Sequence, residues 1–234
     1  MEDMHSRLTR VVSLLLLAAL LTGHIATPPL AHADHDLPGI NTGNAAINVV
    51  VNPVTNKVYT ANRLNASVTV IDGTTEKVLT TLPVGTTPSG IAVNTVTNKV
   101  YVACSGSNSV YVISGTSDSV LKSITVGTHP FAIAVNPVTN RVYVANLAAD
   151  TVSVIDGATD TVVTNVPVGD GPGALAVNPV ANRVYVANTF DTQLSVIDGA
   201  TNGHSTITVG TGAIAVAVNP VRNRIYVAAT GMAA

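Results

Sequence analysis

Charge and aromatic side chains are scarce in this 234-residue sequence. Only 10% of the residues are charged and 3% are aromatic, whereas 47% are hydrophobic, and tryptophan is missing. A soluble domain carries about 25% charged residues, so charge is short here by more than half. Disordered chains combine low hydrophobicity with high net charge, which this composition excludes. The shortage predicts a sheet-rich, mostly buried fold with small polar side chains on its surface.

Basic charge and cysteine are scarce as well. The sequence contains 11 Lys and Arg residues and 13 Asp and Glu residues, which gives a net charge of −2. That balance lacks the electrostatic footprint of a protein that binds nucleic acid through a basic patch. The single cysteine, Cys104, cannot pair within the chain, which excludes a disulfide scaffold. It ends a Val-Tyr-Val-Ala-Cys run, so we expect it to be buried as a small hydrophobe.

The first 33 residues have the parts of a secretory signal peptide. Arg7 and Arg10 precede an apolar run at 11–21, and residues 31–33, Ala-His-Ala, fit the small-x-small cleavage pattern. The run is about half of the roughly 20 apolar residues that a membrane span needs; the alternative is an uncleaved N-terminal anchor. Cleavage there leaves a polar linker at 34–45. We therefore expect an exported prokaryotic protein that is secreted, periplasmic or on the cell surface.

An eight-residue motif, Asn-x-Val-x-Asn-(Lys/Arg)-(Val/Ile)-Tyr, occurs five times. Its first asparagines stand at intervals of 42, 42, 42 and 41 residues: Asn52, Asn94, Asn136, Asn178 and Asn219. Each complete unit contains four β-like runs between turn signals, at 131–135, 141–145, 151–155 and 161–168 in the third unit. Units of about 40–45 residues with four strands each are typical of β-propeller blades.

The predicted fold is therefore an all-β propeller of four-stranded antiparallel blades over residues 46–234. The blades start near residues 46, 90, 131, 174 and 214, and the fifth contains only two strands, so about four and a half blades are present. The segment before residue 46 does not offer the missing strands. We expect an open or truncated propeller, either a fragment of a longer protein or one that self-associates through its open blade edges.

Repeated side chains are expected to serve the blades themselves. We expect the repeated tyrosines to pack between blades and the third and fourth runs, which alternate apolar with polar residues, to lie further from the axis. Three Asp-Gly turns follow the third run, and the basic residue that begins the second run lies beside each of them. We predict one exposed ion pair within each of these blades, worth at most about 1 kcal/mol. The expected pairs are Lys57–Asp72, Arg141–Asp156 and Arg183–Asp198, and Lys99 faces Ser114 instead.

Val-Tyr-Val-Ala-Asn at 142–146 and 184–188, with variants at 58–62, 100–104 and 225–229, resembles the YVTN-type β-propeller repeat. That family includes archaeal surface-layer propellers and bacterial periplasmic propellers similar to YncE. The resemblance covers nearly all of 46–229. It implies an exported, often seven-bladed propeller used for binding and surface display, and it identifies a repeat rather than an activity.

Functional residues are expected where the repeat is broken. The loops that join strands two and three and the loops between blades share one face of a propeller. The non-repeated residues in these loops are Arg63, His129, Asp150, Asp170, Phe190 and Asp191. They either bind a polar ligand or are simply the polar residues of exposed loops. No zinc-ligand spacing and no calcium loop is present, so we expect neither a metal nor a cofactor.

Two functions follow from these features. The first is an exported, non-enzymatic propeller that binds a protein, a glycan or a small ligand on its loop face. The second is an exported propeller enzyme similar to lyases or lactonases, with His129, Asp150 and Asp170 as its candidate residues. A cofactor-linked propeller would need axial or metal ligands that the sequence does not show.

Overall fold

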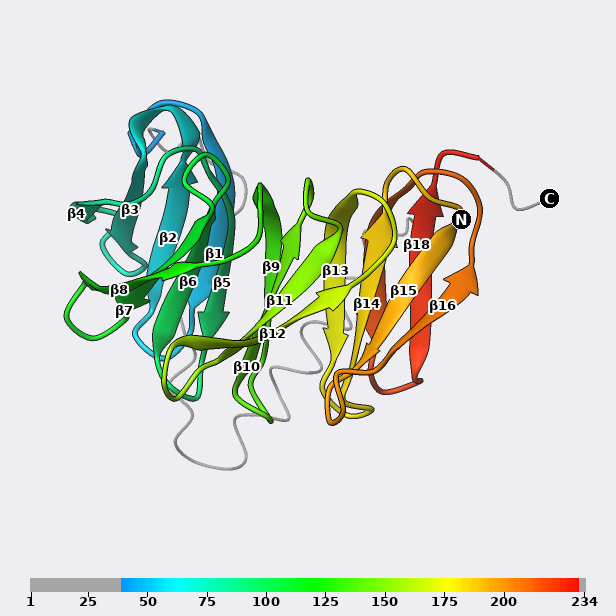
Figure 1. Ribbon diagram of the computed structural model, residues 1–234. Helices are drawn as coiled ribbons and strands as arrows, with labels where there is room; N and C mark the ends of the chain where they lie inside the picture. The colour runs from blue at the N-terminus through cyan, green and yellow to red at the C-terminus, as the bar shows by residue number, and fades with distance from the viewer. Residues whose placement is uncertain (1–38, 232–234) are drawn as a thin grey trace, which may run out of the picture. The chain divides into compact units, whose positions relative to one another are not determined.

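The computed structural model describes residues 39–231. The predicted signal peptide at 1–33 and the first part of the predicted linker lie outside the described residues. Within them, four four-stranded antiparallel sheets and one two-stranded sheet follow one another along the chain (Figure 1). None of the helices in the described part of the chain is long and apolar enough to cross a membrane.

The strands follow chain order within every sheet. The first sheet contains β1 (Ala46–Asn52), β2 (Lys57–Asn62), β3 (Ser67–Asp72) and β4 (Val78–Pro83), with a short 3-10 turn, η1 (Arg63–Asn65), after β2. The second contains β5 (Pro88–Asn94), β6 (Lys99–Cys104), β7 (Ser109–Ser114) and β8 (Ser119–Thr125). The third contains β9 (Pro130–Asn136), β10 (Arg141–Asn146), β11 (Thr151–Asp156) and β12 (Thr161–Pro167). The fourth contains β13 (Pro172–Asn178), β14 (Arg183–Asn188), β15 (Gln193–Asp198) and β16 (His204–Thr208), and the last contains β17 (Ala213–Asn219) and β18 (Arg224–Ala229).

The sheets are propeller blades that stand side by side through their first strands. Contacts join β1 to β5, β5 to β9, β9 to β13 and β13 to β17, and no comparable contact joins β1 to β17 among the described residues. The predicted fold class is thus confirmed as an open β-propeller with a partial fifth blade. We call these sheets blades one to five.

Asparagine fixes the turn between the first two strands of each blade. The Asn52 Oδ1 atom accepts a hydrogen bond from the backbone N–H of Val54 at 3.1 Å. Four residues later Asn56 adopts a left-handed backbone with φ of 49°, a conformation that asparagine tolerates better than most residues. The same pair of asparagines recurs in each blade, which explains their regular spacing.

The hydrophobic core lies between blades rather than inside one of them. The tyrosine of the second strand and the valines of the third pack against the second strand of the next blade: Tyr59, Val68 and Val70 contact Val100 and Val102. The first four repeated tyrosines therefore pack between blades as expected, whereas Tyr226 on the last blade is 58% exposed. The third strands follow the second in every four-stranded sheet, but their alternating sequence does not give them an exposed face, because β11 is buried from Val152 to Ile155. Neighbouring blades cover both faces of that strand, whereas the fourth strands are largely exposed.

The predicted ion pairs are largely wrong in their partners. Lys57 Nζ lies 2.6 Å from Asp118 Oδ2 and Lys99 Nζ lies 2.7 Å from Asp160 Oδ2, so both lysines bridge to the next blade. Of the three expected pairs, Arg141–Asp156 alone forms within its blade in the described part of the chain, at 2.8 Å. The next blade offers each lysine the carboxylate of Asp118 or Asp160, while the Asp72 carboxylate accepts the N–H groups of its own turn, at 2.7 and 2.8 Å. These turn bonds lower the pKa of Asp72, the N–H of Thr75 contributing most.

The Lys–Asp bridge also holds the repeated tyrosine. Tyr101 Oη donates to Asp160 Oδ1 at 2.9 Å, and Tyr59 Oη donates to Asp118 Oδ1 at 3.2 Å. Burial is the largest cause that raises the pKa of both phenols, and the neighbouring carboxylate adds to it. Each bridge therefore joins one lysine, one tyrosine and one aspartate across a blade boundary, and the lysine and aspartate side chains are mostly covered.

A second row of bonds crosses every blade boundary. Asn52 Nδ2 donates to Asn98 Oδ1 at 2.6 Å, and Asn94 Nδ2 donates to Asn140 Oδ1 at 2.7 Å. The next two boundaries have the same bond, from Asn136 to Asn182 and from Asn178 to Asn223, both at 2.9 Å. The two asparagines of the repeated motif therefore have separate roles, one as donor to the next blade and one as acceptor from the previous blade.

Candidate functional site

The first strands of the blades line a cavity of about 380 Å³. Its wall comes from β1, β5, β9 and β13, together with one residue of η1. The lining residues are Ile47, Asn48, Arg63, Ser89, Gly90, Ile91, Phe131, Ala132, Ile133 and Gly173. This volume lies at the lower end of the range for small-molecule sites.

A β-bulge aims one residue of each first strand. The register shifts between Ala46 and Asn48 in β1, and the same shift recurs at the start of β5, β9, β13 and β17. Bulges bend a strand locally and re-aim a side chain. The residue inside the bulge differs in almost every blade: Ile47, Ser89, Phe131, Gly173 and Ile214. The first four of these line the cavity, so the wall varies while the backbone repeats.

The polar groups of the cavity are few and largely fixed. Ser89 is buried, and its hydroxyl donates to the carbonyl oxygens of Ala103 and Pro130, at 3.2 and 2.8 Å. Asn48 Nδ2 donates to the Ser89 carbonyl at 3.3 Å. Arg63 is exposed, and its backbone N–H is anchored to Ala45 at 3.0 Å. The lining contains one cation and no carboxylate, so the cavity favours a neutral or anionic ligand.

An aromatic surface forms the other side of the cavity. Phe131 is 43% exposed, and the His129 ring lies nearly parallel to it, with centroids 6.5 Å apart and an angle of 16°. The His129 backbone is left-handed, with φ of 56°, and its N–H donates to Asn108 Oδ1 at 2.9 Å. His129 therefore supports the Phe131 ring, and it is not itself among the lining residues of this cavity.

The remaining candidate residues lie on the loops that follow. The Asp150 carboxylate accepts the backbone N–H of Gly171 at 2.9 Å, which ties the third blade to the loop that enters the fourth. Asp170 is exposed, and its carbonyl accepts the N–H of Phe190 at 3.2 Å. Asp191 Oδ1 accepts the N–H of Thr192. The cavity lining contains none of the four candidates on these loops, which are Asp150, Asp170, Phe190 and Asp191. Of the six candidates, only Arg63 lines the cavity.

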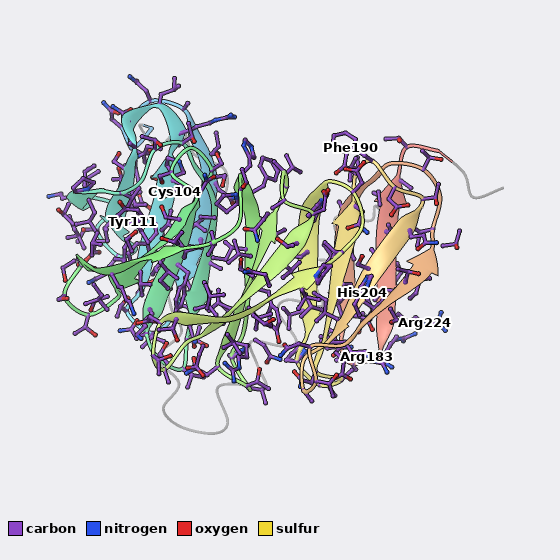
Figure 2. The ribbon with its side chains drawn as sticks, viewed as in Figure 1. Cys104, Tyr111, Arg183, Phe190, His204 and Arg224 are labelled. Carbon is purple, nitrogen blue, oxygen red and sulfur yellow. The ribbon has the colours of Figure 1, made fainter. Side chains whose placement is uncertain are left out.

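Phe190 is an exposed aromatic residue of the loop after β14. Its ring is 69% exposed and stands over Gly171, where an added Cβ would lie 2.4 Å from it. Figure 2 shows Phe190 at the upper end of the fourth blade, whereas Arg183 and Arg224 lie at the lower end. Phe190 therefore belongs to the loop end of its blade, and it is not among the residues that line the cavity.

The described residues contain no group of three or more His, Cys, Asp or Glu side chains placed to hold a metal ion. A second hollow of about 250 Å³ lies at the fourth blade and is lined by Arg183, Val196, Asp198, Gly203, His204 and Ser205. His204 Nε2 lies 3.0 Å from Ser195 Oγ. Cys104 is buried, and burial raises the pKa of its thiol to about 12, so the thiol is poorly suited to act as a nucleophile.

Sequence reasoning missed the bulge residues. It looked for function in loops, whereas the cavity is built by Ile47, Ser89 and Phe131 on the first strands. A signal was present: the second residue of each first strand changes from blade to blade while its neighbours repeat. A variable position inside a constant strand indicates a side chain that does not serve the shared blade packing.

Solved structures similar to this chain are β-propeller proteins. A hydrazine synthase from Kuenenia stuttgartiensis is 25% identical, with a TM-score of 0.68, over 88% of this chain and 58% of its own. The Cps50 (Swd1) β-propeller domain of Myceliophteria thermophila is 14% identical, with a TM-score of 0.69, over 82% of this chain and 64% of its own. A functionally unknown protein from Desulfotomaculum acetoxidans is 12% identical, with a TM-score of 0.70, over 80% and 63%.

These likenesses show the propeller fold. The chain spans less than two thirds of the length of each of these proteins. No protein-family model matches the chain, and no curated protein matches its sequence.

Proposed function

We propose that this protein is a non-enzymatic binding module that holds a small organic anion with an apolar body in the cavity of its first strands. The observation that carries the proposal is the row of bulges, which presents a different side chain from each of four blades to one cavity. Arg63 supplies the positive charge for an anionic group. Phe131 and Ile47, both partly exposed, supply the apolar contact.

The candidate residues for catalysis give the enzymatic alternative no support. The Asp150 carboxylate is already bonded to the Gly171 N–H. His129, Asp150 and Asp170 do not line the cavity, so no observation brings an acid and a base to a ligand held there. Binding without chemistry is therefore the function that the arrangement of these residues supports best.

Export and family membership are part of the proposal. The charged flank, the short apolar run and the cleavage pattern at 31–33 support export to the periplasm, the cell surface or the medium. The Val-Tyr-Val-Ala-Asn runs, which form β10 and β14, support membership of the YVTN-type repeat family. N-terminal sequencing of the protein from the extracytoplasmic fraction should begin at Asp34, and a protein that begins at Met1 would contradict cleavage.

Titration calorimetry tests the cavity with two probes, glucuronate and benzoate. Both carry a carboxylate, but only glucuronate is a saccharide, so the pair separates a glycan site from a site for flat organic acids. We expect at least one probe to bind, and Arg63→Gln to weaken that binding about tenfold or more, because hydrogen bonds to a charged group are worth about 1.5–3 kcal/mol.

Matched variants make the result specific. Phe131→Ala should weaken the same probe, whereas Arg222→Gln should leave it unchanged, because Arg222 is an exposed arginine on the β17–β18 turn, outside the cavity lining. Equal binding by the Arg63→Gln variant and the parent protein would refute the site. Turnover of either probe would refute the non-enzymatic assignment.

A further inference from the structure

The contact between neighbouring blades has a donor side and an acceptor side. At the boundary of blades one and two, blade one supplies the donors: Asn52 Nδ2, Lys57 Nζ and Tyr59 Oη. Blade two supplies the acceptors: Asn98 Oδ1, the Gly115 carbonyl and the Asp118 carboxylate. The boundary of blades two and three repeats this set with Asn140, Gly157 and Asp160 as acceptors. We call these two sides the donor face and the acceptor face.

Blade five presents an uncovered donor face. Asn219, Arg224 and Tyr226 occupy the donor positions of the repeat. The Tyr226 side chain is 58% exposed, whereas its counterparts Tyr59 and Tyr101 are fully buried against the next blade. Arg224 is exposed, and Figure 2 shows it toward the lower end of the last blade. A positive charge, a phenol and an amide donor therefore stand unoccupied on one sheet face among the described residues.

Blade one presents an acceptor face that no other blade covers within residues 39–231. Asn56, Gly73 and Glu76 occupy the acceptor positions of the repeat. Glu76 has a left-handed backbone with φ of 58°, like Asp118 and Asp160 at the same place in the next two blades. Val49 and Val51 on this face are each 58% exposed, whereas Ile91, which takes the place of Val49 in blade two, is 6% exposed.

The bridge between blades forms where the acceptor face carries an acidic residue. In blade four Asn202 takes its place. There Arg141 bonds to Asp156 of its own blade, and the Tyr143 hydroxyl is buried without a partner among the described residues. The bridge across a boundary thus needs the carboxylate, and blade one carries one although no described blade uses it.

We propose that the donor face of blade five docks on the acceptor face of blade one of a second copy of this chain. Arg224 and Tyr226 of one copy meet Glu76 of the other, Asn219 meets Asn56, and Val49 and Val51 are covered. The argument rests on charge complementarity and on continuity with the four blade boundaries already present. The contact is head-to-tail, so it can close into a ring or continue as a chain. It is independent of the proposed ligand site, whose lining residues are different.

Sedimentation velocity of the full chain over a wide concentration range tests the contact. The parent protein should associate as its concentration rises. Arg224→Glu and Glu76→Arg should each weaken association about tenfold or more, because each sets like charges opposite one another. Arg222→Glu is the matched control: it makes the same charge change on an exposed turn residue two positions away and should leave association unchanged.

Mixing the two variants gives the decisive result. The Arg224→Glu protein keeps Glu76, and the Glu76→Arg protein keeps Arg224, so an equimolar mixture should associate more strongly than either variant alone. Circular dichroism and thermal melting of each variant check that the blades are folded. A parent protein that stays monomeric at every concentration would overturn the proposal. Association of either single variant that is as strong as that of the parent protein would also overturn it, because another surface would then carry the contact.

Discussion

Asp160 joins the second and third blades through two side-chain hydrogen bonds. Its carboxylate accepts Lys99 Nζ at 2.7 Å and Tyr101 Oη at 2.9 Å, and the residue is 8% exposed. We predict that Asp160→Asn destabilises the protein markedly, because it removes the charge while keeping the size of the side chain. The matched control is Asp156→Asn, which makes the same change in an ion pair that is about 30% exposed on both sides.

The expected magnitudes differ severalfold. Losing the charge leaves the Lys99 ammonium mostly buried beside a neutral amide and weakens two charge-assisted bonds. A hydrogen bond to a charged group contributes about 1.5–3 kcal/mol, so we expect a loss of about 2–3 kcal/mol for Asp160→Asn. An exposed pair contributes about 1 kcal/mol at most, and asparagine can still accept the turn N–H groups at 156, so Asp156→Asn should cost less than that.

Thermal and urea unfolding, followed by circular dichroism, measure the difference. For a domain of this size each kcal/mol shifts Tm by about 2–4 °C, so Asp160→Asn should lower Tm by about 4–12 °C. Double mutants with Lys99→Met should be less than additive, since the two residues share one contact. A Tm shift for Asp160→Asn no larger than that for Asp156→Asn would refute the claim that buried bridges hold blades together.

Three further predictions concern single blades. Ser114→Asp should raise Tm at pH 7 but not at pH 3, because turn N–H groups lower the pKa of the matching carboxyls in the other blades. The stabilisation is present above the pKa of the unfolded state and fades as pH falls through the pKa of the folded state. An equal gain at both pH values would contradict this. Cys104→Asn should lower the free energy of unfolding by about 1–3 kcal/mol in urea, because Tyr111 stands where the serines of blades three and four accept a hydrogen bond from the matching asparagine. Adding Tyr111→Ser should recover part of that loss, and no recovery would contradict this explanation. Tyr143→Phe should be neutral or stabilising, since it removes a buried hydroxyl that has no partner in the described part of the chain, and a large fall in Tm would show an unseen partner.

The repeat made the architecture predictable. Regular asparagines, β-branched runs and Asp-Gly turns are local signals, and each maps onto one strand or turn of the blade. The partial fifth blade followed from the same count of runs. The side-chain partners did not follow, because Lys57 reaches a residue 61 positions away in the next blade. Register within a blade places Lys57 beside Asp72 in the backbone, but it carries no information on which blade the ammonium faces.

The candidate site was predictable only in part. Arg63 lies in the cavity, as a non-repeated loop residue should if loops carry function. Phe131 and Ile47 escaped because apolar residues on a strand are ordinarily part of the core. Only the bulge, a backbone irregularity that depends on pairing with the second strand, turns Phe131 toward the cavity. The variation of that position among blades was the available signal.

The central claim is that a ligand enters the cavity at Phe131, and fluorine NMR tests it most directly. The chain contains two phenylalanines, so labelling with 4-fluorophenylalanine gives one signal in the cavity, from Phe131, and one on the outer loop, from Phe190. Phe190→Leu assigns the two signals. We predict that the probe found by calorimetry shifts the Phe131 signal in a saturable way, leaves the Phe190 signal in place, and loses this effect in the Arg63→Gln variant. A saturable shift of the Phe190 signal alone, or a Phe131 shift that does not depend on Arg63, would contradict the claim.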